Sequence, residues 1–158
     1  MRSTKSGPGR CSRKTFLYPR SRKKRGFHTH QGIDFFPKRE DVEAGLPIPI
    51  LSVTDGHVCC VLEWDGESNG YGNVIAVYDG ERTFWYAHCA KTLFHEGETV
   101  REQQQIAIVG NTGRAGKPHL HFEVHEGRSN GPPAKERTIF DPSGPRLDPR
   151  EVLEALTE

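Results

Sequence analysis

A strict alternation of polar and apolar side chains in the last third of the chain is the feature that most constrains the fold. The polar positions are His119, His121, Glu123 and His125, and the apolar positions between them are Leu120, Phe122 and Val124. Because successive side chains of a strand point to opposite faces, the pattern predicts a half-buried β-strand over residues 119–125. The same rule puts the rings of His119 and His121 on one face, where both reach the same cleft.

Short β-rich runs separated by turns make up most of the remaining chain. Strands are expected over residues 48–53, 56–64, 73–78, 83–88 and 106–109. Asp-Gly pairs at 55–56 and 79–80 supply tight turns between them. Successive strands joined by short turns favour a mostly antiparallel sheet.

Helix is scarce, and one segment is expected, over residues 149–156. Asp148 can cap it, Pro149 suits its first position, and Glu151 completes a capping box. A Gly- and Pro-rich loop is expected over 127–147. The chain is therefore predicted to be mainly β: a single domain on a curved antiparallel sheet of sandwich or roll type, with long loops and a short C-terminal helix.

Charge is unevenly distributed, although 22 Lys and Arg nearly balance 21 Asp and Glu. The first 25 residues hold ten basic residues and no acidic one. We expect a basic, flexible N-terminal arm over 1–25 and a folded domain over 26–158. Three roles of the arm stay open: a solvated tail, contact with a polyanion such as a wall polymer or nucleic acid, and a targeting signal.

No apolar run approaches the ~20 residues that a membrane helix needs. The N-terminus also lacks the apolar segment of a secretory signal. A trimmed chain, an unusual route of export and retention inside the cell therefore all stay open.

The four cysteines are Cys11, Cys59, Cys60 and Cys89. They form no Cys-x-x-Cys pair, so a thiolate zinc site is not expected. Adjacent Cys59 and Cys60 would face opposite sides of a strand, so one of them is expected in the core. Free thiols and one disulfide involving Cys89 both stay open.

Histidine and carboxylate side chains gather in residues 28–34, 86–88 and 119–121. Both groups suit zinc, and a catalytic zinc ion needs three protein ligands and one open position. His30 and Asp34 flank Gly32, and a bent strand or turn there would bring their side chains together. Neither the His-x-His spacing nor the His-x-x-x-Asp spacing is a strong signal for a metal site. From spacing alone, a metal site and a set of unrelated histidines are therefore about equally plausible.

Five segments in order strengthen the metal hypothesis. They are His30-Gln31-Gly32-Ile33-Asp34, Gly70-Tyr71-Gly72-Asn73, Tyr86-Ala87-His88, Val109-Gly110-Asn111-Thr112-Gly113 and Pro118-His119-Leu120-His121-Phe122-Glu123. From residue 26 to residue 126 the chain resembles the lysostaphin-type, LytM-like zinc endopeptidases, and the last segment is the most specific. Departures from the family's usual residues at 101–105 and 115–117 lie in expected loops, so they bear on substrate preference more than on chemistry.

The resemblance implies that His30, Asp34 and His121 hold one zinc ion per chain and that His88 and His119 are the catalytic histidines. It implies a monomeric zinc metallopeptidase domain over 26–158. The implied substrate is bacterial peptidoglycan, cut in its peptide cross-bridges or stem peptides; glycine-rich bridges and D-Ala-containing stems both stay open. Such a protein would act in the cell wall, the periplasm or outside the cell.

Histidines must carry the protons of such a hydrolysis, because no His-Glu-x-x-His motif supplies a glutamate base. An unperturbed histidine titrates near ~6.5, which suits proton transfer at neutral pH. One of His88 and His119 would orient or deprotonate the attacking water. The other would stabilise the oxyanion or protonate the leaving amine, and the assignment of the two roles stays open.

Residues near the motifs have alternative interpretations. Tyr71 either contacts substrate or packs beside its turn, and Asn73 is expected to shape the turn. Glu123 is either the hydrogen-bond partner of a ligand histidine or a solvated strand residue. The isolated histidines His57, His95 and His125 are expected to be inert surface residues.

Three rival functions stay open as well. One is a zinc-binding regulator without catalysis, against which the retained His88 and His119 count. Another is a module that binds cell walls or nucleic acid through its basic arm, with salt-sensitive affinity that survives zinc removal. The third and weakest is a cytosolic or nuclear protein with an unrelated substrate.

Overall fold

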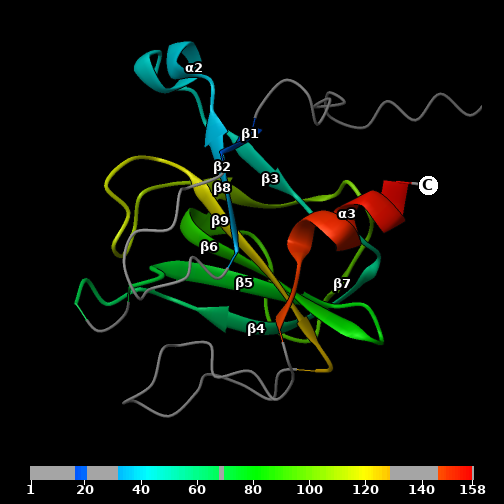
Figure 1. The fold of residues 1–158 in the computed structure, drawn as a ribbon. Helices are drawn as coiled ribbons and strands as arrows, with labels where there is room; N and C mark the ends of the chain where they lie inside the picture. The colour runs from blue at the N-terminus through cyan, green and yellow to red at the C-terminus, as the bar shows by residue number, and fades with distance from the viewer. Residues whose placement is uncertain (1–16, 21–31, 68–69, 129–145, 158) are drawn as a thin grey trace, which may run out of the picture.

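Ten strands form one antiparallel sheet in the computed structural model, which describes residues 17–20, 32–67, 70–128 and 146–157 (Figure 1). The strands are β1 (Leu17–Arg20), β2 (Ile33–Pro37), β3 (Pro49–Leu51), β4 (Gly56–Leu62), β5 (Asn73–Tyr78), β6 (Arg82–Thr92), β7 (Thr99–Val100), β8 (Gln105–Val109), β9 (Leu120–Glu126) and β10 (Arg146–Leu147). The helices are α2 (Arg39–Glu43) and α3 (Pro149–Thr157). The predicted mainly β fold with a short C-terminal helix is confirmed.

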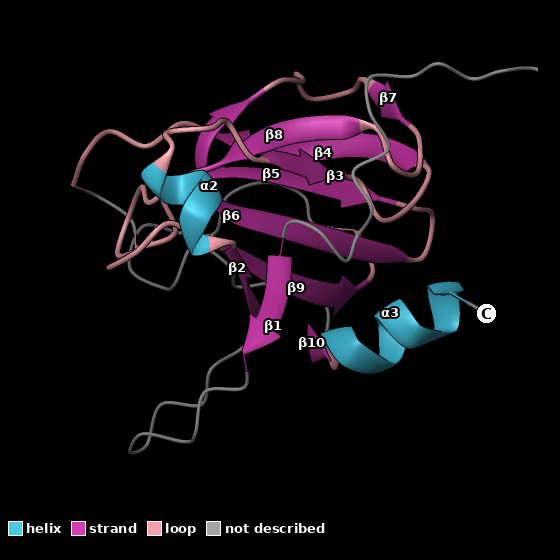
Figure 2. Cartoon of the chain, turned by 90° about the horizontal axis from the view of Figure 1, so that it is seen from above, coloured by secondary structure: helices cyan, strands magenta, loops and turns pink. Residues whose placement is uncertain are grey.

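Strand β6 is the centre of the sheet. The main path runs β1-β2-β9-β6-β5-β4-β7, while β8 pairs with both β3 and β6 and β10 pairs with β9. Figure 2 shows α2 and α3 near different edges of the sheet. In the described part of the chain, no helix has the length and apolar character that crossing a membrane requires.

Most predicted elements are confirmed within a few residues. Strand β5 coincides with the predicted run over 73–78, and β4, β6, β8 and β9 match theirs closely. Asp148 caps α3, because its Oδ1 accepts a hydrogen bond from the Arg150 N–H at 2.9 Å. The run predicted over 48–53 forms only the three residues of β3. Neither α2 nor the short β7 and β10 had been predicted.

Two predicted segments lie mainly outside the described residues. The loop predicted over 127–147 falls largely in 129–145, and its last two residues form β10. Within the N-terminal arm predicted over 1–25, Leu17–Arg20 form β1 and pair with β2. The boundary at residue 26 stays a prediction.

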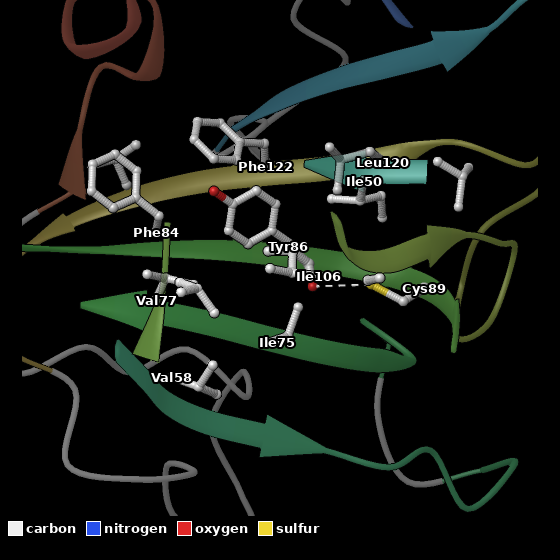
Figure 3. Packing of buried hydrophobic residues seen from close by; sticks show 14 of the residues in the cluster. Ile50, Val58, Ile75, Val77, Phe84, Tyr86, Cys89, Ile106, Leu120 and Phe122 are labelled. Carbon is white, nitrogen blue, oxygen red and sulfur yellow. Dashed lines mark hydrogen bonds between the residues drawn. The ribbon is translucent and has the colours of Figure 1, made fainter. Parts of the chain in front are cut away.

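One face of the sheet covers the larger apolar core. Its members alternate along β5, β6 and β9 and meet residues of β3, β4, β8 and α3. The fully buried residues labelled in Figure 3 include Ile75 and Val77 of β5, Phe84 and Tyr86 of β6, and Phe122 of β9. Each such side chain contributes about 1.5–3 kcal/mol relative to exposure, so this face supplies most of the apolar stabilisation.

The opposite face carries a smaller cluster and, beside it, polar side chains. The buried cluster residues are Cys60, Val74, Ala76, Trp85 and Ala87. Because β9 alternates, the polar residues 121, 123 and 125 share this face, while Leu120, Phe122 and Val124 enter the larger core. The strand predicted as half-buried is therefore buried on both faces, a correction whose cause is that its polar residues pair with one another.

The cysteines are divided between the two apolar clusters. Cys60 is fully buried in the smaller cluster, so the prediction that one of the adjacent pair lies in the core is confirmed. Cys59 is only partly buried and packs against the same cluster, because the pairing of β4 with β5 shifts its register between Val58 and Cys60. Cys89 is buried in the larger core. Cys59, Cys60 and Cys89 are free thiols. Cys11 lies outside the described residues.

Candidate active site

Asp34 and His121 face one another on adjacent strands. They are direct partners in the antiparallel pairing of β2 with β9. Both side chains are buried, and His121 Nδ1 lies 3.0 Å from Asp34 Oδ1. A carboxylate and an imidazole thus meet at one point, held by the two strands.

His119 directly precedes β9, and its ring approaches the Asp34 carboxylate. Its Nε2 lies 3.6 Å from Asp34 Oδ1, and its Nδ1 donates a hydrogen bond to the Lys117 carbonyl at 2.7 Å. The ring of Phe36 stacks on it with 5.2 Å between centroids. Because a carbonyl oxygen only accepts, the Nδ1 proton is fixed and Nε2 of the neutral ring carries the lone pair.

His88 lies beside His119, at an irregular point of β6. Its backbone has a φ of 60°, in the left-handed region. Its N–H donates to the Tyr71 carbonyl at 2.7 Å, and its Nδ1 donates to the Thr112 carbonyl at 2.8 Å. The ring centroid lies 4.7 Å from that of His119 and 5.9 Å from that of His121. Three imidazoles and one carboxylate therefore share a small volume.

Two glycine-containing turns interlock behind His88. A Cβ on Gly72 would lie 2.2 Å from Thr112 Oγ1, so only glycine allows this approach. Thr112 Oγ1 donates to the Cys89 carbonyl at 2.7 Å and accepts from the Asn73 N–H at 3.0 Å. Thr112 thereby ties its own turn to β6 and to β5, and its carbonyl fixes the His88 ring.

The side chain of Asn73 also links β5 to neighbouring segments. Its Oδ1 accepts from the Trp64 N–H at 2.7 Å, and its Nδ2 donates to the carbonyls of Cys89 and Ala90. These contacts confirm the predicted structural role of Asn73.

Glu123 and His125 form a buried extension of the site. Glu123 is 0% exposed and His125 is 1% exposed. One Glu123 oxygen accepts from His121 Nε2 at 2.7 Å and from the Tyr71 hydroxyl at 3.2 Å; the other accepts from His125 Nε2 at 2.8 Å. The prediction that His125 is an inert surface residue is wrong, because the site face of β9 is covered and Glu123 pairs with it there.

Burial and hydrogen bonding set the protonation of these groups. Burial would lower the pKa of His121, but hydrogen bonds to Asp34 and Glu123 and their charges raise it to about 9. Burial would raise the pKa of Glu123, but hydrogen bonds from His121 and His125 lower it to about 2. Burial lowers the pKa of His88 to about 4, only partly offset by its hydrogen bond to Thr112. At neutral pH the metal-free site thus holds a cationic His121 and a neutral His88.

The structure brings together four of the five predicted site residues, and the fifth, His30, lies outside the described residues. Across the described ranges no group of three His, Cys, Asp or Glu side chains is arranged to hold a metal ion. The Asp34 carboxylate and the His121 imidazole are nevertheless donors that suit zinc, and they already converge. The residues present therefore fit two of the three predicted ligands.

Sequence reasoning missed contacts that only the fold creates. The stacking of Phe36 on His119 and the hydrogen bond from His88 to Thr112 join segments far apart in the chain. Trp85 is 1% exposed and packs in the smaller cluster. The alternation in β9 did contain a signal for His125, because it placed this residue on the face of His121.

Comparison with known families decides what kind of domain this is. The model described as Peptidase family M23 matches residues 28–134, more than half of the chain. The chain belongs to this family. The matched region contains every predicted site residue, so the resemblance to lysostaphin-type metallopeptidases drawn from the sequence is confirmed.

Relatives and solved structures agree with the assignment. The chain is 36% identical to an uncharacterized metalloprotease of Haemophilus influenzae over 65% of this chain and 20% of that protein. It is 34% identical to the DD-carboxypeptidase/endopeptidase Mpg of Neisseria meningitidis over 72% of this chain and 23% of that protein. The catalytic domain of lysostaphin from Staphylococcus simulans superimposes with a TM-score of 0.57 at 25% identity, covering 88% of this chain and 89% of that domain. The chain thus spans about a fifth to a quarter of the length of these curated relatives.

Proposed function

We propose that this chain is a zinc-dependent endopeptidase that hydrolyses peptide cross-bridges or stem peptides of bacterial peptidoglycan. The observation that carries the proposal is the meeting of Asp34 and His121 at 3.0 Å beside the paired rings of His88 and His119. Membership of peptidase family M23 and the similarity to a DD-carboxypeptidase/endopeptidase and to lysostaphin support the substrate class.

In this proposal His30, Asp34 and His121 hold one zinc ion per chain. A bound zinc ion would supply the Lewis acidity that polarises the scissile carbonyl and makes a water molecule acidic. His121 must give up its Nδ1 proton to become a ligand, so zinc affinity should fall as the pH drops below the pKa of about 9.

His88 and His119 share the proton transfers of the reaction. Both donate from Nδ1 to a backbone carbonyl, so each neutral ring has its basic Nε2 available. One ring orients the attacking water or accepts a proton from it at Nε2. The other ring stabilises the oxyanion or passes a proton to the leaving amine, and for either role its Nε2 must first take up a proton. The lowered pKa of His88 keeps its ring neutral, and able to accept a proton, throughout the range of physiological pH.

Peptidoglycan as substrate implies action in the cell wall, the periplasm or outside the cell. The chain is proposed to act as a monomer. Contact of the basic arm over 1–25 with a polyanion stays a prediction.

The test is digestion of purified peptidoglycan of several chemotypes by zinc-loaded protein. Released amines and fragment masses are followed for walls with glycine bridges and for walls with directly linked D-Ala stems. The expected result is cleavage that requires zinc, and the fragment masses name the bond. Absence of release from every wall despite stoichiometric zinc would contradict the proposal and favour a non-catalytic zinc protein.

Two variants separate metal binding from proton transfer. His121→Ala should lose the metal and with it all cleavage. His88→Ala should keep zinc and lose turnover by about 10²–10⁴-fold, the usual contribution of general acid–base catalysis. Zinc content by mass spectrometry and turnover on the cleaved wall are measured for both, and full activity of His88→Ala would refute the role given to that ring.

A further inference from the structure

Behind the proposed ligand His121 lies a chain of buried hydrogen bonds that the proposed reaction does not use. Glu123 accepts from His121 Nε2 through one oxygen and from His125 Nε2 through the other, at 2.7 and 2.8 Å. The Tyr71 hydroxyl adds a third donor at 3.2 Å. Since Glu123 and His125 are at most 1% exposed, water does not compete for these contacts.

We propose that Glu123 and His125 are positioning residues that fix the ring orientation and the tautomer of His121. The inference rests on the proposed function, because it assigns these two residues to the zinc ligand. A carboxylate only accepts hydrogen bonds, so Glu123 holds a proton on His121 Nε2. The remaining lone pair of the neutral ring then lies on Nδ1, the atom that faces Asp34.

His125 has the task of holding the carboxylate in place. A carboxylate bound on one side only could rotate and lose its contact with His121. His125 follows Glu123 by two residues in β9, so both side chains share one face and the Nε2 atom meets the second oxygen. The ring of Trp85 packs edge-on against His125, with centroids 6.3 Å apart and planes at 81°, and confines it.

Gly32 leaves the space that this arrangement needs. A Cβ at this position would collide with the Phe122 carbonyl oxygen and would lie 2.8 Å from Glu123 Cγ and 3.1 Å from His121 Cε1. Three segments thus surround Glu123 and His125. Strand β9 carries both residues, β6 supplies Trp85, and Gly32, directly before β2, leaves space for the Glu123 side chain. Partners of ligand histidines commonly matter for metal binding, and their loss weakens affinity by about 10–100-fold.

The experiment measures zinc affinity of the full chain by competition with a chromophoric chelator. His125→Phe keeps a ring and removes the donor, His125→Gln keeps a donor, and Glu123→Gln removes the charge. Glu126→Gln, an exposed residue of the same strand, is the matched control. We expect zinc affinity about 10–100-fold weaker for His125→Phe and Glu123→Gln, a substantial recovery for His125→Gln, and no change for Glu126→Gln.

A second readout does not depend on activity. Long-range ¹H–¹⁵N spectra of the zinc-loaded protein report which nitrogen of His121 carries the proton. We expect a single Nε2-protonated form in the parent and a mixed or exchange-broadened signal in Glu123→Gln. These spectra also show whether a variant is folded, so a folding failure is recognised and the remaining variants decide.

The outcomes distinguish this inference from the proposed function. Folded variants that bind zinc as tightly as the parent and keep the same His121 spectrum would overturn the positioning role. A parent that binds zinc with the expected variant pattern and cleaves no wall would contradict the proposed activity and leave the positioning role supported.

Discussion

Replacing Gly72 by alanine tests whether the two turns behind His88 are packed as tightly as the structure indicates. The backbone of Gly72 has a φ of +72°, and a Cβ there would lie 2.2 Å from Thr112 Oγ1 and 2.5 Å from the Thr112 carbonyl carbon. The second contact is with backbone, which cannot swing away as a flexible side chain does. Gly72→Ala therefore combines a conformational cost with a steric one.

Gly45 provides a matched control. Its φ of +67° is nearly the same, and no atom lies within 4 Å of a Cβ added there. Left-handed backbone costs an alanine about 1–2 kcal/mol, which is the full effect expected for Gly45→Ala. Overpacking adds about 1–3 kcal/mol, so Gly72→Ala should lose about 2–5 kcal/mol of unfolding free energy.

The assay is urea unfolding followed by tryptophan fluorescence, with a chelator present so that bound metal does not add to stability. The result that matters is the difference between the two variants, expected to be about 1–3 kcal/mol. Equal losses would show that the Thr112 turn moves aside at no cost, and the account of how His88 is held would then fail. A loss in Gly72→Ala should also lower turnover, because the Thr112 carbonyl fixes the His88 ring.

The remaining predictions concern His88, Asn73 and Gln103. Burial lowers the pKa of His88 to about 4, so in the metal-free chain an NMR titration should show its ring neutral down to that pH. This pKa in the folded chain lies below the value of ~6.5 for an unperturbed histidine in the unfolded chain. The contribution of His88 to the unfolding free energy is therefore complete above pH ~6.5 and declines as the pH falls towards 4. His88→Gln should flatten this decline, measured by urea unfolding at several pH values. Asn73→Ala removes hydrogen bonds to Trp64, Cys89 and Ala90 and should cost about 1–3 kcal/mol by the same assay, whereas an unchanged midpoint would contradict the structural role. Gln103 has a φ of 65°, a left-handed conformation that is strained for a residue other than glycine. Gln103→Gly should therefore leave the unfolding free energy unchanged or raise it by up to about 1 kcal/mol. A clearly lower melting temperature of the variant would show that the backbone at Gln103 is not strained.

Much of the sheet could be predicted because its local signals agree. β5 is bounded by a glycine turn and an Asp-Gly turn, and the alternation of β9 extends over seven residues. Helix α2 could not be predicted, since it has five residues and Lys38 at its N-cap makes no side-chain hydrogen bond. The helix is too short to show a helical repeat in the sequence, and no capping residue marks its start.

The exposure of β9 could not be predicted from alternation. Alternation of polar and apolar residues indicates two different faces, and it does not say that the polar face meets water. Here that face is covered, and His121, Glu123 and His125 satisfy one another. Alternation therefore identified which side chains share a face and gave the wrong answer about solvent.

The placement of His88 shows why a site of this kind requires irregular backbone. Along β6 the residues Trp85 and Ala87 point to the site face, and regular alternation would put Cys89 there next. Instead Cys89 is buried in the larger core, because the pairing of β5 with β6 shifts its register between Asn73 and Ile75 and the chain adopts a left-handed φ at residue 88. Such a bulge re-aims one side chain without ending the strand. The left-handed backbone costs about 1–3 kcal/mol, and it persists since the Tyr71 and Thr112 carbonyls hold the residue from both sides. The bulge turns the His88 ring into the site, 4.7 Å from His119, where a regular strand residue at this position would point into the larger core; this is the placement that the proposed proton-transfer role needs.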